Sequence, residues 1–156
     1  NMQAELQACQ TGLRQANQVL PEISLLRQDM ELAQALGLAD LPAQDTQALI
    51  QVVAVLAQRE NLERVWQCLK ARCEDGNRAA TDPEIGLLDS VLRWYNHNWQ
   101  SRPYRRIDAA PRSAYDYERH QRSRHTSGGD AIQEQRLPGI ADGSGKPLCK
   151  ALVCTQ

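Results

Sequence analysis

The sequence has no phenylalanine, three tryptophans and four tyrosines in 156 residues, so a folded core must consist mainly of Leu, Ala, Val and Ile. Long apolar runs are also missing. The longest stretches, such as Val52–Ala57, fall far short of the roughly 20 residues that a membrane-spanning helix needs. No apolar block follows a charged start, as it would in a signal peptide. The five cysteines are an odd number, which favours reduced thiols over a disulfide framework. We therefore expect a cytoplasmic protein that neither enters a membrane nor is secreted.

Charge is distributed unevenly along a chain of otherwise ordinary globular composition. Residues 1–99 carry 8 Lys or Arg and 13 Asp or Glu, a net charge of −5, whereas residues 100–156 carry 10 and 6, a net charge of +4. Hydrophobic residues make up 42% and charged residues 24%, which suits one or two small folded domains. A basic C-terminal third predicts a partner with an acidic surface, which is a protein or a nucleic acid.

The first hundred residues have the apolar periodicity of helices. Spacings of three and four residues predict a helix-pairing seam that begins the chain and contains Leu6, Cys9, Leu13, Ala16, Leu20 and Ile23. Pro21 ends or kinks this first helix, and a second helix is expected from Pro21 to Leu36, with Gly37 after its C-terminus. Residues 45–75 form either one helix or two, because the apolar stripe breaks at Arg59–Asn61.

A further helix is predicted from residue 83 to 99. Thr81 and Glu84 have the spacing of a capping box, and Pro83 suits the first turn. The helix should bury one face, made of Leu88, Val91, Leu92, Tyr95 and Trp99.

After Gln100 the helical periodicity disappears and short extended runs replace it. Strands are expected at Tyr104–Ile107, Ala131–Leu137 and Leu148–Thr155, and the last alternates like a half-buried strand. Gly143–Gly145 is expected to form the hairpin turn between the last two runs, and the polar segment Arg122–Asp130 to form a flexible loop.

The predicted fold class is therefore α+β. A helical region over residues 2–100, a coiled coil or helix bundle, precedes a small β domain over residues 101–156. So thin a β domain needs support from the helices or from a second copy. A homodimer through the helical region is expected, because apolar surface remains on Leu6, Leu13, Leu20, Leu26 and the stripes within residues 49–73.

The sequence favours neither a metal site nor an enzyme. Cys68 and Cys73 are five residues apart, as are Cys149 and Cys154, whereas structural zinc takes cysteines two to four residues apart. Buried thiols that pack as small hydrophobic groups are the better interpretation. No glycine-rich elbow presents a nucleophile and no phosphate-binding glycine loop precedes a helix. We expect no catalytic residues, no cofactor and no metal.

One basic segment leaves a nucleic-acid interface as an alternative. Residues 102–125 contain seven arginines interleaved with Tyr104, Tyr115 and Tyr117, and such patterns bind single strands by charge and stacking. The pI near 6.3 and the intervening acidic residues oppose it.

Three C-terminal segments resemble one known family. Residues 115–120, Tyr-Asp-Tyr-Glu-Arg-His, resemble the Phe-Asp-Pro-x-x-His step that opens the β domain of the GrpE family, the nucleotide exchange factors of Hsp70 chaperones. Residues 134–140, Glu-Gln-Arg-Leu-Pro-Gly-Ile, are similar to that family's Glu-Val-Leu-Gln-Pro-Gly-Tyr. Residues 145–153 are similar to its closing Gly-Arg-Val-Leu-Arg-Pro-Ala-x-Val strand. The segments occur in the family's order, and the resemblance covers residues 83–156.

The resemblance implies a co-chaperone that works by shape rather than by chemistry. Such a homodimer presents a β domain to the nucleotide-binding domain of an Hsp70-type chaperone and promotes nucleotide release. By this resemblance the partner-binding residues are Tyr115, His120, Arg122, Arg136, Leu137, Pro138, Gly139 and Lys146. Arg136 and Lys146 are expected at matched places in one sheet, where they flank a tight Pro138-Gly139 turn.

The chain also departs from the family pattern. Leu137 stands where the family has Gln, and Lys146 where it has Arg. Residues 3–60 are rich in Gln, Leu and Ala, whereas the family has a long N-terminal helix rich in Arg, Lys and Glu. The alternative is an adaptor or assembly protein that keeps the architecture without exchange activity.

Overall fold

The computed structural model describes residues 2–18, 21–126 and 128–156, with the side chains of 11–18 left aside. In this part of the chain helices come first and strands follow, so the structure is α+β as predicted. It divides into two compact units, Asn1–Val52 and Val53–Gln156. The division does not fall near residue 100, because two helices before that point pack against the strands.

The first unit contains short helices. They are α1 (Met2–Gln18), α2 (Pro21–Gln28), α3 (Met30–Ala35) and the beginning of α4 (Asp45–Leu56). The predicted single helix from Pro21 to Leu36 is wrong, because Asp29 interrupts it. The Asp29 carboxylate accepts a hydrogen bond from the Leu32 N–H at 3.1 Å and so caps α3.

The end of α3 follows the sequence prediction. Gly37 has a φ of 73°, its N–H donates to the Gln34 carbonyl at 3.1 Å, and the Leu38 N–H donates to the Ala33 carbonyl at 2.7 Å. These two bonds form a Schellman motif, which favours glycine at the left-handed position. In the predicted helix-pairing seam, Met2 to Gln10 are exposed, whereas Leu13, Ala16 and Leu20 lie outside the described side chains.

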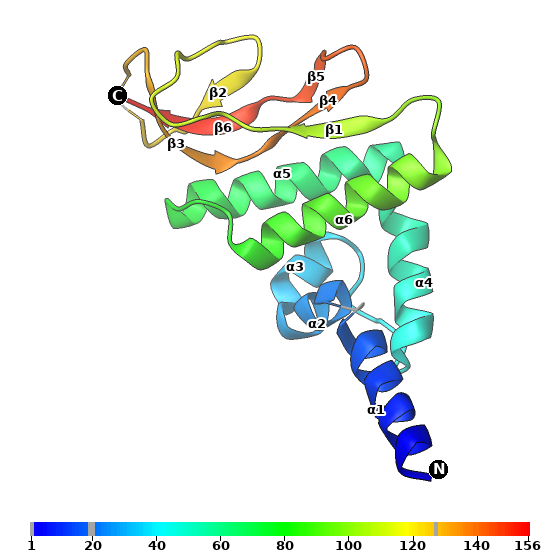
Figure 1. The fold of residues 1–156 in the computed structure, drawn as a ribbon. Helices are drawn as coiled ribbons and strands as arrows, with labels where there is room; N and C mark the ends of the chain where they lie inside the picture. Colours follow the sequence, from blue (N-terminus) through cyan, green and yellow to red (C-terminus); the bar gives the residue numbers. More distant parts are fainter. Residues whose placement is uncertain (1, 19–20, 127) are drawn as a thin grey trace. The chain divides into compact units, whose positions relative to one another are not determined.

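The second unit begins with an antiparallel pair of helices, α5 (Arg59–Gly76) and α6 (Asp82–Asn98) (Figure 1). Residues 45–75 thus form two helices, with the break at residues 57–58. The α5 stripe of Leu62, Trp66, Leu69 and Cys73 is fully buried, so it is not available to a second copy. At the end of α5, Asn77 adopts the left-handed conformation with a φ of 47°.

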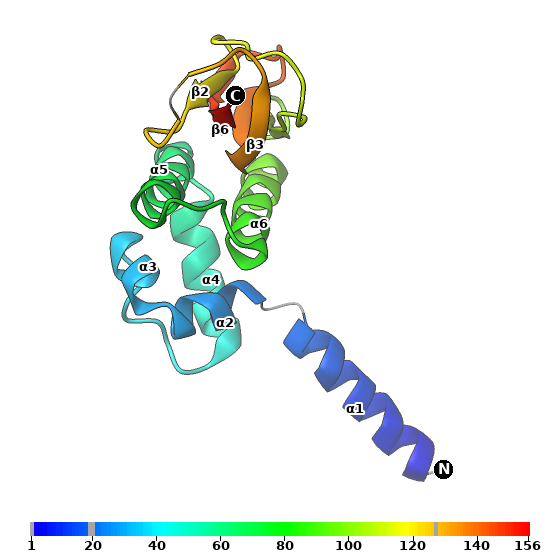
Figure 2. The same ribbon diagram turned by 90° about the vertical axis from the view of Figure 1, so that its left-hand side faces the viewer.

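Six short strands complete this unit: β1 (Tyr104–Ile107), β2 (His120–Arg122), β3 (Ile132–Leu137), β4 (Gly139–Asp142), β5 (Pro147–Cys149) and β6 (Ala151–Thr155). They form two three-stranded sheets, in the orders β1-β4-β5 and β2-β6-β3. The first sheet is antiparallel, and β6 pairs parallel with β2 and antiparallel with β3. Figures 1 and 2 show the sheets as a layer on one side of α5 and α6.

The chain changes sheet three times, first over the long segment between β1 and β2 and then at two crossings of a single residue each. Pro138 alone separates β3 from β4, and Lys150 alone separates β5 from β6. The single strand predicted over Leu148–Thr155 is therefore two strands in different sheets. Strands β2 and β4 were not predicted, and the Gly143–Gly145 turn joins β4 to β5.

Strand β6 is buried along its whole length rather than on one face. Ala151 and Val153 pack into a small cluster with Ala109 and Ile132, against which Tyr115 packs. Leu152 lies on the opposite face of the strand and pairs with Leu137 of β3. The half-buried prediction is wrong because the segment after β1 covers the face that should have met solvent. No helix in the described residues combines the length and hydropathy needed to cross a membrane.

Candidate partner-binding surface

The crossing at Pro138 is anchored to α5. The indole N–H of Trp66 donates to the Pro138 carbonyl at 2.7 Å, in a fully buried position. Two residues earlier, the Arg136 carbonyl accepts the Ala80 N–H at 2.7 Å. These bonds satisfy backbone groups that leave the β ladder where the chain changes sheet. They also hold the sheets on the helix pair.

Burial removes three predicted contact residues from the surface. Leu137, Pro138 and Gly139 are all buried. A Cβ at Gly139 would lie 2.6 Å from both the Ala151 N and the Cys149 O, so the two crossings touch there. The Pro138-Gly139 step is thus a close crossing and not an exposed tight turn, and these residues serve the fold.

Arg136 also has a structural role, whereas the sequence predicted an exposed partner-binding side chain. Its side chain is 11% exposed, pairs with Glu134 at 2.9 Å and donates to the Asn77 side chain at 2.6 Å. Arg136 belongs to β3, whereas Lys146 precedes β5 in the other sheet. The expectation that the two cations share a sheet is therefore wrong.

Lys146 is exposed on a preorganised turn. The Asp142 carboxylate accepts hydrogen bonds from the Ser144 hydroxyl at 2.6 Å, the Ser144 N–H at 2.9 Å and the Lys146 N–H at 3.0 Å. The Ser144 hydroxyl above all, and then the two N–H groups, lower the pKa of Asp142. Carboxylate and turn thus hold each other in one conformation, with the Lys146 side chain in solvent.

Tyr115, His120 and Arg122, which the resemblance names as partner-binding, lie together and are partly tied to one another. The Arg122 guanidinium lies 3.8 Å from the Tyr115 ring centroid, and the Tyr115 hydroxyl donates to the His120 carbonyl at 3.2 Å. The His120 ring accepts the Asp116 N–H at 3.0 Å. Burial lowers the pKa of His120 and so favours the neutral ring, although the charge of Asp116 acts in the opposite direction.

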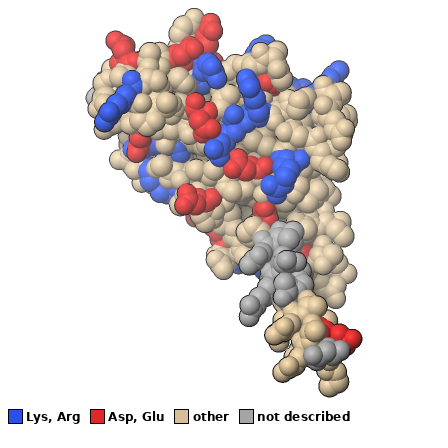
Figure 3. Space-filling model, in the orientation of Figure 1, with Lys and Arg blue, Asp and Glu red and all other residues tan. Residues whose placement is uncertain are grey.

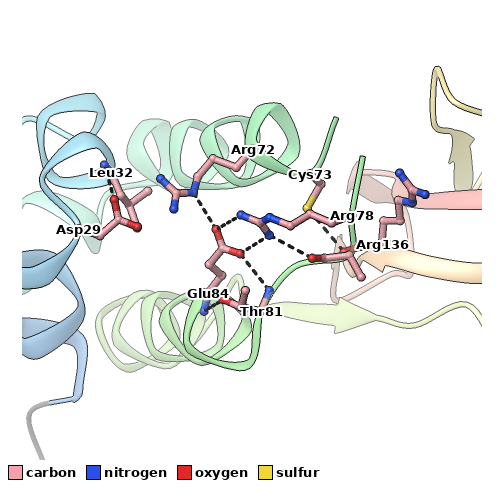
Figure 4. A network of polar contacts seen from close by, with 9 residues as sticks. Asp29, Leu32, Arg72, Cys73, Arg78, Thr81, Glu84 and Arg136 are labelled. Atoms are coloured by element: carbon pink, nitrogen blue, oxygen red, sulfur yellow. Dashed lines mark hydrogen bonds and ion pairs between the residues drawn. The ribbon is translucent and has the colours of Figure 1, made fainter. Parts of the chain in front are cut away.

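Two buried carboxylates are saturated by hydrogen bonds. Glu84 pairs with Arg72 at 2.8 Å and with Arg78 at 2.7 Å, and accepts the Thr81 N–H at 2.9 Å (Figure 4). The Thr81 hydroxyl in return accepts the Glu84 N–H, so the predicted capping box is confirmed. Burial alone would raise the pKa of Glu84, but these donors outweigh it and lower the pKa to about 2.

The second carboxylate, Glu74, connects the end of α5 to the segment after β2. It accepts hydrogen bonds from the Ser123 hydroxyl and from the Arg124 N–H, the latter at 2.9 Å. The His125 ring contacts the Glu74 carbonyl at 2.6 Å. Burial opposes ionisation of Glu74, yet the two hydrogen bonds lower its pKa. This acid holds a loop and has no free oxygen for chemistry.

Three cysteines are packed as the sequence suggested, because Cys73, Cys149 and Cys154 are buried. Cys68 is only half-buried, and Cys9 is exposed. Burial raises the pKa of Cys149 to about 12, and burial followed by the charge of Glu84 raises that of Cys73 to about 11, so neither is a thiolate nucleophile. Within residues 2–18, 21–126 and 128–156, no group of three or more His, Cys, Asp or Glu has metal-binding geometry.

Cationic residues do not form a continuous track on the face seen in Figure 3. Lys and Arg are interspersed with Asp and Glu over the sheets. Several of the C-terminal arginines have partners: Arg106 pairs with Asp89 and Asp108, and Arg124 with Asp75. This mixture is less suited to a phosphate backbone than to a protein surface.

Sequence reasoning missed one exposed aromatic group. Trp99 was expected on the buried face of its helix, but it follows the last residue of α6 and is 55% exposed. It stacks on Tyr95 with a centroid distance of 6.5 Å, and Tyr95 contacts Tyr104 at 5.3 Å. The end of the helical periodicity near residue 99 is the signal that could have indicated an exposed position.

Comparison with known proteins identifies no relative. No protein-family model matches the chain, and neither the curated proteins nor the solved structures contain a significant match.

Proposed function

We propose that this chain is a GrpE-like nucleotide exchange factor, a cytoplasmic co-chaperone that binds the nucleotide-binding domain of an Hsp70-type chaperone as a homodimer. The observation that carries the proposal is the position of the three family-like segments. Residues 115–120 lead into β2, residues 134–140 contain the crossing at Pro138, and residues 145–153 contain the crossing at Lys150. The resemblance therefore coincides with the steps that define the double-sheet topology.

The proposed mechanism is mechanical. A partner that binds the open form of a nucleotide cleft better than the closed form shifts the population toward nucleotide release. This needs a rigid platform and an exposed contact group. The helix pair anchored through Trp66 and the loop held by Glu74 suit the platform, and Lys146 on its Asp142-fixed turn suits the contact.

Stimulated nucleotide release tests the proposal directly. An Hsp70-type chaperone from the same genome is loaded with fluorescent ADP and chased with unlabelled ATP, with and without this chain. We expect the chain to accelerate release by at least about tenfold, which corresponds to roughly 1.4 kcal/mol off the barrier. An unchanged release rate at saturating chain concentration would refute exchange activity.

An adaptor without exchange activity is the second candidate. The fully buried Leu137 favours it, because the family's Gln is replaced there by a residue with no polar group to offer a partner. Binding to the same chaperone without any change in release rate would support the adaptor instead.

A further inference from the structure

Trp99 is a large apolar side chain presented to solvent on a rigid support. Its ring stacks on Tyr95, which is 5% exposed and belongs to the helix core. Two hydrogen bonds fix the start of β1 to the end of α6. The Asn96 side chain donates to the Tyr104 carbonyl at 2.6 Å and accepts a hydrogen bond from the Tyr104 N–H at 2.8 Å. A preorganised tryptophan loses little side-chain entropy on binding, as in the centre of many protein interfaces.

The turn that carries Lys146 adjoins the segment that follows Trp99. A Cβ at Gly143 would lie 3.9 Å from the Pro103 ring, and one at Gly145 would lie 3.9 Å from an Arg105 guanidinium nitrogen. Pro103 directly precedes Tyr104. The connection from α6 to β1 and the β4–β5 turn are therefore side by side, at the same end of β1.

The charges of this end of the unit are predominantly positive. Arg102, Arg105 and Lys146 are exposed, and among the described residues no carboxylate forms an ion pair with any of them. The nearby Asp142 is engaged by the N–H groups of its own turn. Arg106, one residue from Arg105, contrasts with them because Asp89 and Asp108 neutralise it.

We propose that Trp99, Pro103, Arg105 and Lys146 form one docking surface for an acidic face of the Hsp70-type nucleotide-binding domain, with Trp99 as the apolar anchor. The inference rests on the proposed function, and it adds Trp99 as an anchor and Arg105 as a second cation to the Lys146 contact. An apolar centre with a cationic rim is complementary to an apolar site edged by carboxylates. The rim should mainly set the association rate, and the anchor the dissociation rate.

The experiment measures binding of the purified nucleotide-binding domain, without nucleotide, to immobilised chain. Variants Trp99→Ala and Arg105→Glu are compared with Tyr117→Ala and Arg119→Glu. These controls change another exposed aromatic residue and another exposed arginine, beyond the other end of β1. We expect roughly 10- to 30-fold weaker binding for the first two and less than twofold change for the controls. Circular dichroism and a melting curve show that each variant is folded.

The outcomes separate the two proposals. If the parent binds and accelerates release but Trp99→Ala and Arg105→Glu bind as it does, the docking surface is wrong and the exchange function stands. Equal losses in the two control variants would also overturn this surface. If the parent itself does not bind, the proposed function fails and the docking surface fails with it. Since Trp99 also ends α6, Arg105→Glu decides the matter if Trp99→Ala is not folded.

Discussion

The indole of Trp66 and the carbonyl of Pro138 are joined by a buried 2.7 Å hydrogen bond across 72 positions of sequence. This bond holds a helix to the residue at which the chain leaves one sheet for the other. It also explains how a core without phenylalanine orients two small sheets, because a tryptophan supplies both apolar area and a donor.

Replacing Trp66 by Phe should lower the free energy of unfolding by about 1–3 kcal/mol, because the buried Pro138 carbonyl loses its donor. Chemical denaturation measures the change. Trp94→Phe is the control, since Trp94 is only half-buried and should lose much less. Equal losses in the two variants would show that the hydrogen bond does not matter.

Gly139→Ala should destabilise the second unit by about 1–3 kcal/mol or prevent folding, because the added Cβ would lie 2.6 Å from backbone atoms of both Cys149 and Ala151. Gly86→Ala is the matched control. Gly86 is exposed within α6, and a Cβ there meets nothing within 4 Å, so alanine should stabilise by about 0.5–1 kcal/mol. Thermal melting of both variants checks the opposite signs.

Glu84 should make folding sensitive to acid. Its folded-state pKa of about 2 lies below the ordinary 4.5, so its stabilisation is complete above about pH 4.5 and is lost as the pH falls toward 2. The loss should amount to about 3 kcal/mol. Glu84→Gln should be less stable at pH 7 and should lose less stability between pH 5 and 2.5 than the parent.

Asp82→Asn controls for a general effect of the helix N-terminus, since Asp82 is exposed in the same turn. Denaturation curves at five pH values compare the three proteins. A parent whose stability falls no more steeply than that of Glu84→Gln would contradict the prediction.

Arg136 and Lys146 should respond differently to charge reversal. Arg136→Glu breaks a nearly buried ion pair and places a second carboxylate beside Glu134, so the free energy of unfolding should fall by about 2 kcal/mol. Lys146→Glu should change stability by less than about 0.5 kcal/mol while it weakens chaperone binding by roughly 10- to 30-fold. Calorimetry and a binding titration test the two halves, and equal stability of the variants would refute this division of roles.

The chain should be a homodimer through α1. Met2 and Leu6 are 84% and 61% exposed, whereas Leu26 and the α5 stripe are already buried within the chain. Light scattering at micromolar concentration should return twice the 17.5 kDa of one chain. Leu6→Lys should weaken the dimer, and Met30→Lys, a change at a similarly exposed residue of α3, should not. A particle of 17.5 kDa for the parent would refute the dimer.

Features that depend on neighbours in the chain could be predicted from the sequence. The capping box of Thr81 and Glu84, the left-handed Gly37, and the order of helices before strands all follow from residue types at short spacing. The two-helix reading of residues 45–75 was among the alternatives, because a break in an apolar stripe is also a local signal.

Features that depend on distant contacts were decided by the tertiary structure. Pattern alone could not divide Leu148–Thr155 at Lys150, because the pairing partners of its two halves lie in different sheets. It could not show that Arg136 meets Asn77 across 59 positions, or that Trp99 meets solvent where the helix ends. Local spacing determines which element forms, whereas the packing of elements far apart in sequence determines which cations and aromatic groups remain exposed for a partner.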